Sequence, residues 1–88
     1  MMKSTYHLYR IDWIDAASQS SWIHLNDLQD PVDYTVSTVG WLIQDTDDYY
    51  VLSQNLSSSM GASDRMQIPK KWIKRKRRIQ GHIIEYRD

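Results

Sequence analysis

Alternating apolar and polar residues predict a β-strand near the start of the chain. Within residues 6–14, Tyr9, Ile11 and Trp13 occupy every second position, and charged residues lie between them. An extended chain places alternate side chains on opposite faces, so these three aromatic and aliphatic residues share one face. The segment is therefore expected to form a strand with a single apolar face.

The middle of the chain predicts a β-hairpin. Residues 34–44 are rich in β-branched and aromatic side chains, and residues 49–54 continue that composition after a polar turn at 45–48. Gly40 lies inside the first of these two strands. An interior glycine weakens a strand by itself, so it indicates a sharp bend or a close approach of another backbone.

Between the first two strands, the spacing of Trp22, Leu25 and Leu28 predicts a short helix. Pro31 disfavours helical geometry in the residue before it, so this helix is expected to end ahead of the proline. Its apolar stripe is only two turns long, and it needs a larger partner surface to be stable.

The last third of the chain contains two breaks, a proline and a glycine. Small polar residues predict a flexible loop, and the proline favours a 3₁₀ turn before a strand. The expected order is a flexible loop at 56–64, a short strand at 65–68, a 3₁₀ turn at 69–72, a strand at 73–79, and a tail or extra strand at 80–88.

Length and composition fit one small domain. The 88 residues are 41% hydrophobic and 25% charged, which is ordinary for a globular domain. No apolar run approaches the ~20 residues of a membrane span, and the first residues lack the apolar segment of a secretion signal. Cysteine is absent. We expect a single domain over residues 1–88 in the cytoplasm, without a membrane partner.

The net charge is zero, but the charges are separated along the chain. Residues 11–64 contain nine aspartates and no Lys or Arg, whereas seven of the nine residues at 70–78 are basic. Such asymmetry indicates an anionic partner or association between copies, and it is also compatible with neutralisation inside one domain.

Two stretches resemble small β-barrels. VGWLIQDTDDYYVL (39–52) looks like the glycine-bent strand pair of Sm-like proteins, and IPKKWI (68–73) looks like the 3₁₀ turn and final strand of SH3-like barrels. With the predicted elements, this resemblance implies a mainly β, five- or six-stranded SH3-like/Sm-like barrel. A short helix is expected in its first connection and a 3₁₀ turn before its last strand.

Residues 8–79 are also similar to a group of small, mostly uncharacterised bacteriophage-encoded proteins. This similarity implies a location in the cytoplasm of a host cell. The chain lacks the Tyr-Lys-His triplet of bacterial Sm-like RNA binders and the Ala-Leu-Tyr-Asp-Tyr pattern of SH3 peptide binders. The resemblance therefore implies a fold and no ligand class.

The basic run is the main candidate binding site. Phosphate binding requires several cations held close together. Simple alternation places Ile73 and Arg75 on one face of a strand, with Lys74 and Lys76 on the other. The alternative is an edge strand that uses charge to resist aggregation. The candidate ligand-binding cations are Lys70, Lys71, Lys74, Arg75, Lys76, Arg77 and Arg78.

Aromatic residues supply either the core or surfaces on which a base can stack. The chain has no Phe, so Trp13, Trp41 and Trp72 are expected in the core. Tyr49 and Tyr50 are adjacent in a strand and point to opposite faces. One of them is therefore expected to be exposed, and it is the candidate stacking residue.

The sequence shows no pattern for catalysis or metal binding. Its three His residues lack metal-ligand spacing, and no glycine loop suits a phosphate. The aspartates at 45, 47 and 48 fit a solvated turn better than a calcium loop, which needs more ligands. We expect no enzyme activity, no metal and no cofactor.

Three functional hypotheses follow. The first is a non-enzymatic, phage-like protein that binds nucleic acid or a nucleotide through the basic strand, as a homo-oligomer in which the first strand or residues 82–86 pair with another copy. The second is an inhibitor that binds and blocks a host enzyme or defence protein through the aspartate-rich span 11–64. The third is a minor structural protein of a virion.

Overall fold

The computed structural model describes residues 3–16, 24–27 and 33–87. These residues form five strands and two short 3₁₀ helices, and no α-helix is present among them. The prediction of a mainly β protein is confirmed. In chain order the elements are β1 (Lys3–Ala16), η1 (Leu25–Asp27), β2 (Asp33–Asp45), β3 (Tyr49–Leu56), β4 (Ala62–Pro69), η2 (Lys70–Trp72) and β5 (Ile73–Arg87).

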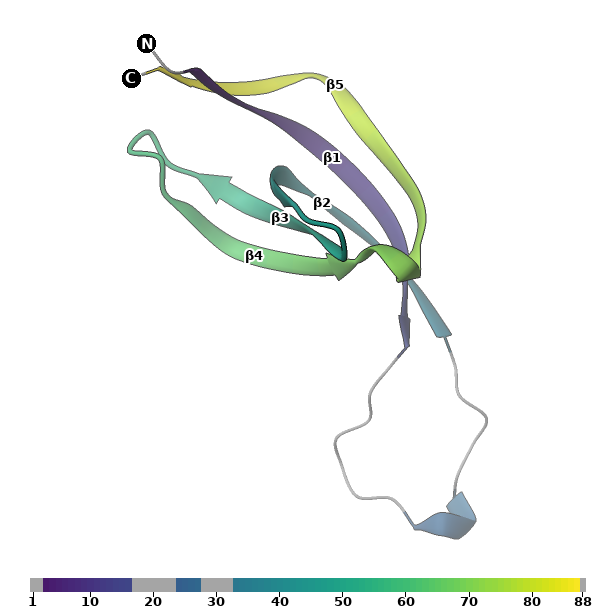
Figure 1. Cartoon of the computed structure of the whole chain (residues 1–88). Coiled ribbons are helices and arrows are strands. Elements are labelled where there is room, and N and C mark those ends of the chain that lie inside the picture. Colours follow the sequence, from purple (N-terminus) through teal and green to yellow (C-terminus); the bar gives the residue numbers. More distant parts are fainter. Residues whose placement is uncertain (1–2, 17–23, 28–32, 88) are drawn as a thin grey trace.

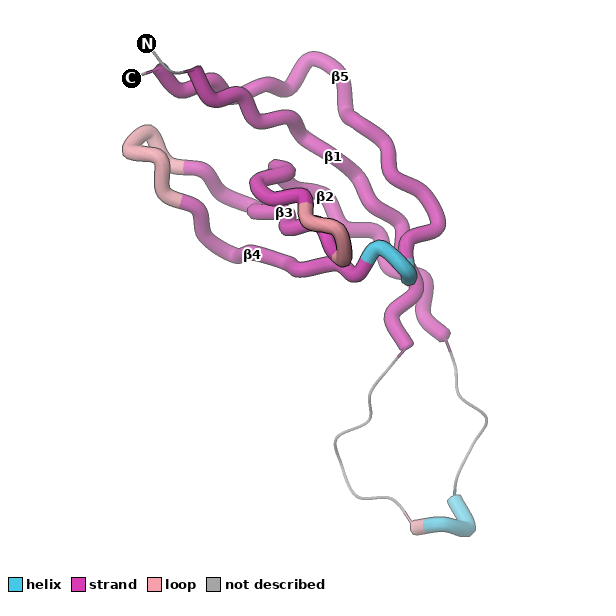
Figure 2. Tube along the Cα trace, in the orientation of Figure 1, coloured by secondary structure: helices cyan, strands magenta, loops and turns pink. Residues whose placement is uncertain are grey.

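All five strands belong to one antiparallel sheet with the order β4-β3-β2-β1-β5. The first four strands follow one another as a meander, and η2 then carries the chain across so that β5 returns beside β1 (Figures 1 and 2). β1 therefore has a partner on both sides. Within the described residues the sheet is open, and β4 and β5 are its two edges.

The core requires this sheet to curl. Neighbouring strands lie about 4.8 Å apart, so β1 and β4 would be about 14 Å apart in a flat sheet. Ile11 and Trp13 of β1 nevertheless form one buried cluster with Leu52 of β3 and Ile68 of β4. Tyr9 packs against the same cluster, so the predicted apolar face of the first strand is confirmed. Figure 1 shows the resulting curvature.

Gly40 lies where β2 passes closest to β3. The glycine is buried, and a Cβ atom added to it would lie 2.9 Å from the carbonyl oxygen of Ser53 and 3.0 Å from Cβ of Leu52. The close backbone approach predicted for this glycine is therefore confirmed. The β2–β3 ladder shifts register between Leu42 and Gln44, which leaves Ile43 as an extra residue beside the bend.

The end of the chain differs from the prediction. β5 continues through Gly81 to Arg87, so residues 80–87 form neither a separate sixth strand nor a tail. Gly81 has a φ of 85°, a left-handed conformation that glycine adopts without steric cost. It lies in an irregular stretch where four residues, 79–82, face the single residue Leu8. The chain therefore accommodates Gly81 within β5 as part of a bulge.

Three other predicted segments have different outcomes. The loop expected at 56–64 is shorter, because residues 62–64 already belong to β4, where Ala62 and Ser63 pair with β3. The predicted 3₁₀ turn after Pro69 is confirmed as η2. The helix expected at 22–28 lies largely outside the described residues, which show η1 within it.

Replacing Gly40 with alanine is expected to lower the free energy of unfolding by about 1–3 kcal/mol, because the new methyl group collides with backbone across the ladder. Urea unfolding followed by circular dichroism measures this change. Gly61→Ala is the control, since its Cβ would meet only the Ser57 side chain in the β3–β4 loop and no backbone of a neighbouring strand. Equal losses in the two variants would contradict the close-approach explanation.

Candidate nucleic-acid interface

A bulge at the start of β5 decides which way the basic side chains face. Trp13 pairs with Ile73 and Asp12 pairs with Arg75, so Lys74 is an extra residue in the ladder. Residues paired directly across two strands share a face. Ile73 therefore lies on the core side with Trp13, and Arg75 lies on the outer side. The simple alternation expected for this strand, with Ile73 and Arg75 on one face, is wrong.

On the outer face, β5 places arginines beside a small polar network from β1 and β2. Arg77 pairs with Arg10, two residues along each strand from the pair formed by Arg75 and Asp12, so it lies on the same face. Arg10 Nε donates a hydrogen bond to Asp12 Oδ1 at 3.0 Å, and the Ser37 hydroxyl donates to the same oxygen at 2.6 Å. Asp12 thus neutralises Arg10 and lies near Arg75, while Arg77 makes no ion pair among the described residues.

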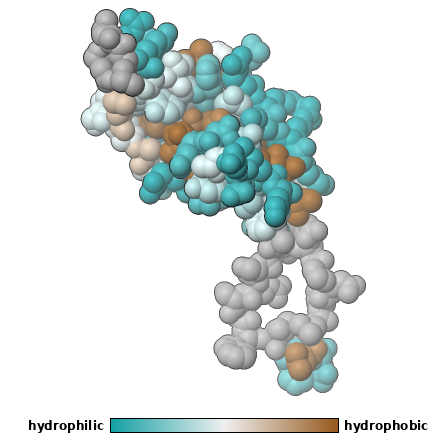
Figure 3. Space-filling model, in the orientation of Figure 1, coloured by the Kyte–Doolittle hydropathy of each residue, from teal (hydrophilic) through white to brown (hydrophobic). Residues whose placement is uncertain are grey.

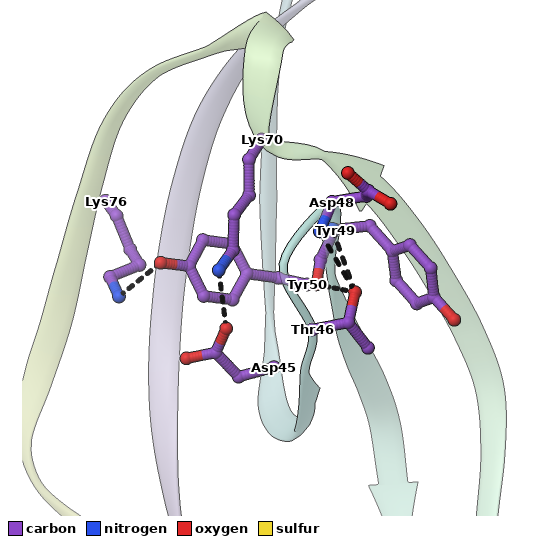
Figure 4. A network of polar contacts seen from close by, with 7 residues as sticks. All are labelled: Asp45, Thr46, Asp48, Tyr49, Tyr50, Lys70 and Lys76. Carbon is purple, nitrogen blue, oxygen red and sulfur yellow. Dashed lines mark hydrogen bonds and ion pairs between the residues drawn. The ribbon is translucent and has the colours of Figure 1, made fainter.

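On the core face, two of the seven candidate cations surround Tyr50 (Figure 4). Lys76 Nζ lies 4.3 Å from the centre of the Tyr50 ring and donates a hydrogen bond to its hydroxyl at 3.0 Å. Lys70 Nζ lies 4.5 Å from the same ring centre and forms a 2.6 Å ion pair with Asp45. Lys76 also lies 5.5 Å from the ring centre of Tyr9. These contacts join β5 and η2 to the β2–β3 hairpin.

The remaining five cations are exposed. The four salt bridges found among the described residues all involve basic residues outside 71–78. None of the five donates a side-chain hydrogen bond to another described residue. The structure thus divides the predicted set into two occupied members, Lys70 and Lys76, and five that are available to a ligand: Lys71, Lys74, Arg75, Arg77 and Arg78.

The two adjacent tyrosines point in different directions, as Figure 4 shows. The ring of Tyr50 packs against the core and carries two lysines, so it offers no open surface to a base. Tyr49 lines a shallow depression of about 650 Å³ over the other face of β2–β4, with Gln44, Arg65 and Gln67. The structure does not bring Tyr49 together with the basic strand.

The three tryptophans predicted for the core differ in burial. Trp13 is buried as predicted, while Trp41 is half-buried and lies outside the core cluster. Trp72 keeps 42% of its surface exposed, so its assignment to the core is wrong. The sequence did hold a signal for this, because Trp72 follows Pro69 and two lysines in a turn that leaves the sheet.

Two carboxylate contacts are strong enough to move pKa values. The Ser37 hydroxyl, and then the Arg10 guanidinium, lower the pKa of Asp12 from its usual 3.8. The hydrogen bond to Asp45 raises the pKa of Lys70 above its usual 10.5. Each shift favours the charged form of its residue, Asp12 as a carboxylate and Lys70 as an ammonium.

Other kinds of site find little support in the part of the chain that the structure describes. No three His, Asp or Glu side chains converge there to hold a metal ion. No helix in those residues has the length and apolarity needed to cross a membrane. Comparison of the chain with models of protein families, with curated proteins and with solved structures finds no match.

Asp12→Asn is expected to lower the melting temperature at neutral pH and to matter less in acid. A carboxylate whose pKa is lowered by folding stabilises the fold at pH values above its usual pKa. This contribution is lost as the pH falls from the usual pKa through the lowered one. The gap between variant and wild type should therefore shrink below pH 3.8.

Thermal melts at a series of pH values measure this gap. Asp47→Asn is the control, because the Asp47 side chain makes no hydrogen bond or salt bridge with any residue that the structure describes. A gap for Asp12→Asn that stays constant down to the acid limit would contradict the assigned contacts.

Proposed function

We propose that this protein is a non-enzymatic binding protein that holds nucleic acid by its phosphates. The binding surface is the start of β5 together with Lys71 of η2, and its cations are Lys71, Lys74, Arg75, Arg77 and Arg78. The proposal rests on one observation, namely that these five charges are exposed and lack ion pairs among the described residues.

The spacing of these charges suits a polyanion better than a single phosphate. Residues two apart on a strand lie about 6.6 Å from each other, so Arg75 and Arg77 span more than one phosphate group. After the bulge at Lys74, ordinary strand alternation places Arg75 and Arg77 on the outer face and Arg78, which pairs with Tyr9, on the opposite side. A flexible phosphate backbone that follows the free edge of β5 can therefore meet side chains from both faces.

We also propose that the curled sheet is an SH3-like/Sm-like small barrel. Three features support this assignment. β4 and β5 are joined by a 3₁₀ turn, and β1 lies between β2 and β5. β5 also reaches across the curled sheet through side chains, since Lys76 donates to the Tyr50 hydroxyl of β3 and the Tyr86 hydroxyl donates to the Ser57 carbonyl oxygen in the loop between β3 and β4.

A homo-oligomer remains a proposal, with one restriction. β1 pairs with β5 over Lys3–Trp13 and with β2 over Leu8–Ala16, so its middle part is flanked on both sides, while residues 3–7 pair with β5 alone. The outer edges of β4 and β5, including residues 82–86, and the β2 side of residues 3–7 are the edges left for pairing with another copy among the described strands.

Inhibition of a host protein through the aspartate-rich span is less well supported. Asp45 is paired with Lys70 and Asp12 with Arg10, so folding neutralises two members of that span. No contact within the described residues favours a virion component. On the face that Figure 3 shows, hydrophilic residues predominate, with smaller hydrophobic patches between them.

Fluorescence anisotropy with a labelled oligonucleotide tests the proposal. Affinity should fall steeply between about 50 and 200 mM salt, because each neutralised phosphate releases counterions. Arg75→Ser/Arg77→Ser should weaken binding and make the slope of log K against log salt shallower by about 1.4 on a single strand.

The control is Lys3→Ser/Arg65→Ser, which removes the same charge from residues outside β5. It should leave the slope close to that of the wild type. Equal effects from both double variants would indicate non-specific attraction. Absence of salt-sensitive binding, together with aggregation of Arg75→Ser/Arg77→Ser, would instead show that the cations protect a sheet edge.

A further inference from the structure

Trp72 is an exposed aromatic ring held at the start of the basic strand. Its ring stacks on Trp13 with an interplanar angle of 9° and 6.4 Å between ring centres. Trp72 is the last residue of η2, and Ile73 begins β5 directly after it. Trp72 therefore lies between Lys71 and the other four available cations.

The support beneath Trp72 is fixed. Trp13 is 6% exposed, and its indole N–H donates a 3.0 Å hydrogen bond to the Thr38 hydroxyl. The turn that carries Trp72 is anchored as well, because the Lys70 backbone N–H donates to the Asp48 carbonyl at 2.9 Å. A ring held on a buried partner needs little further ordering when a ligand binds, which lowers the entropic cost.

Much of Trp72 is left accessible. Trp13 lies nearly parallel to it in an offset stack, with 6.4 Å between the ring centres, and 42% of the Trp72 surface remains exposed. Lys71 precedes the ring and Lys74 follows it closely, and both are exposed. An accessible aromatic ring between cations is the combination that proteins use for unpaired bases, which stack on the ring while the charges hold the phosphates.

We infer that the nucleic acid is single-stranded and that one of its bases stacks on the exposed ring of Trp72. The base extends the Trp13–Trp72 stack by one ring, and the phosphates beside it follow β5 past Arg75 and Arg77. A duplex does not offer this contact, because its bases are stacked on one another inside the helix. This inference rests on the proposed function and adds the substrate class to it.

The test compares three probes of equal phosphate number: a single-stranded oligonucleotide, the same strand without bases, and a duplex. Trp72→Leu should weaken binding of the base-bearing strand about 10-fold, within the range for loss of one base–aromatic stack. It should change binding of the abasic strand by less than about twofold, because the phosphate contacts remain. Trp72→Phe, which keeps a ring, should stay closer to the wild type.

Ile83→Ala is the matched control, because it removes an exposed apolar side chain from the far part of the same strand. It should leave the affinity for all three probes unchanged. The abasic strand also reports on folding, since a variant that binds it normally has kept β5 in place. If Trp72→Leu does not fold, tryptophan fluorescence of the wild type replaces it, with quenching expected from the base-bearing strand and none from the abasic strand.

The outcomes separate the two proposals. Equal affinity for the abasic and base-bearing strands, or tighter binding of the duplex, would overturn the stacking inference and leave phosphate binding intact. An equal loss for both single strands in Trp72→Leu would also overturn it. Failure of every probe to bind in a salt-dependent manner would overturn the proposed function itself.

Discussion

Curling of the sheet is the constraint on which the rest of this structure depends. A chain this short must build its core from few residues, and here the buried cluster draws on β1, β3 and β4. Strands three positions apart in a flat sheet cannot share a core, so the apolar faces meet only when the sheet bends. Gly40 permits that bend because β3 passes where any side chain would collide. Hydrophobic burial drives the curvature, and the glycine removes the steric obstacle to it.

The same curvature determines which basic residues remain available. It brings the inner side of β5 against Tyr50 and Tyr9, where the Lys76 ammonium lies over both rings and donates to the Tyr50 hydroxyl. The bulge at Lys74 sets the phase of the strand, so Ile73 faces the core and Arg75 faces out. Packing thus uses two of the cations, Lys70 and Lys76, and leaves a continuous group of charges on the edge.

Zero net charge conceals an uneven distribution over the folded surface. The acidic side chains that form ion pairs, Asp12, Asp45 and Glu85, all pair with cations outside 71–78. Such surface pairs contribute little to stability one by one. Their larger consequence is that they occupy carboxylates that could otherwise neutralise β5. Five cations without ion pairs among the described residues therefore lie near an exposed tryptophan, and this combination supports our proposal of a nucleic-acid ligand.

The sequence by itself determined approximately where the strands lie, the apolar face of β1, the close approach at Gly40 and the turn after Pro69, because each depends on local periodicity or on one residue's backbone chemistry. It also located the basic run. It did not give the full extents of β4 and β5. It could not predict which residues of β5 face the core, which contacts Lys70 and Lys76 make, or that Trp72 is exposed. Those depend on which residue pairs with which across β1 and on what the curled sheet brings near Tyr50. Register and curvature arise from contacts between distant segments, so only the tertiary structure decided them.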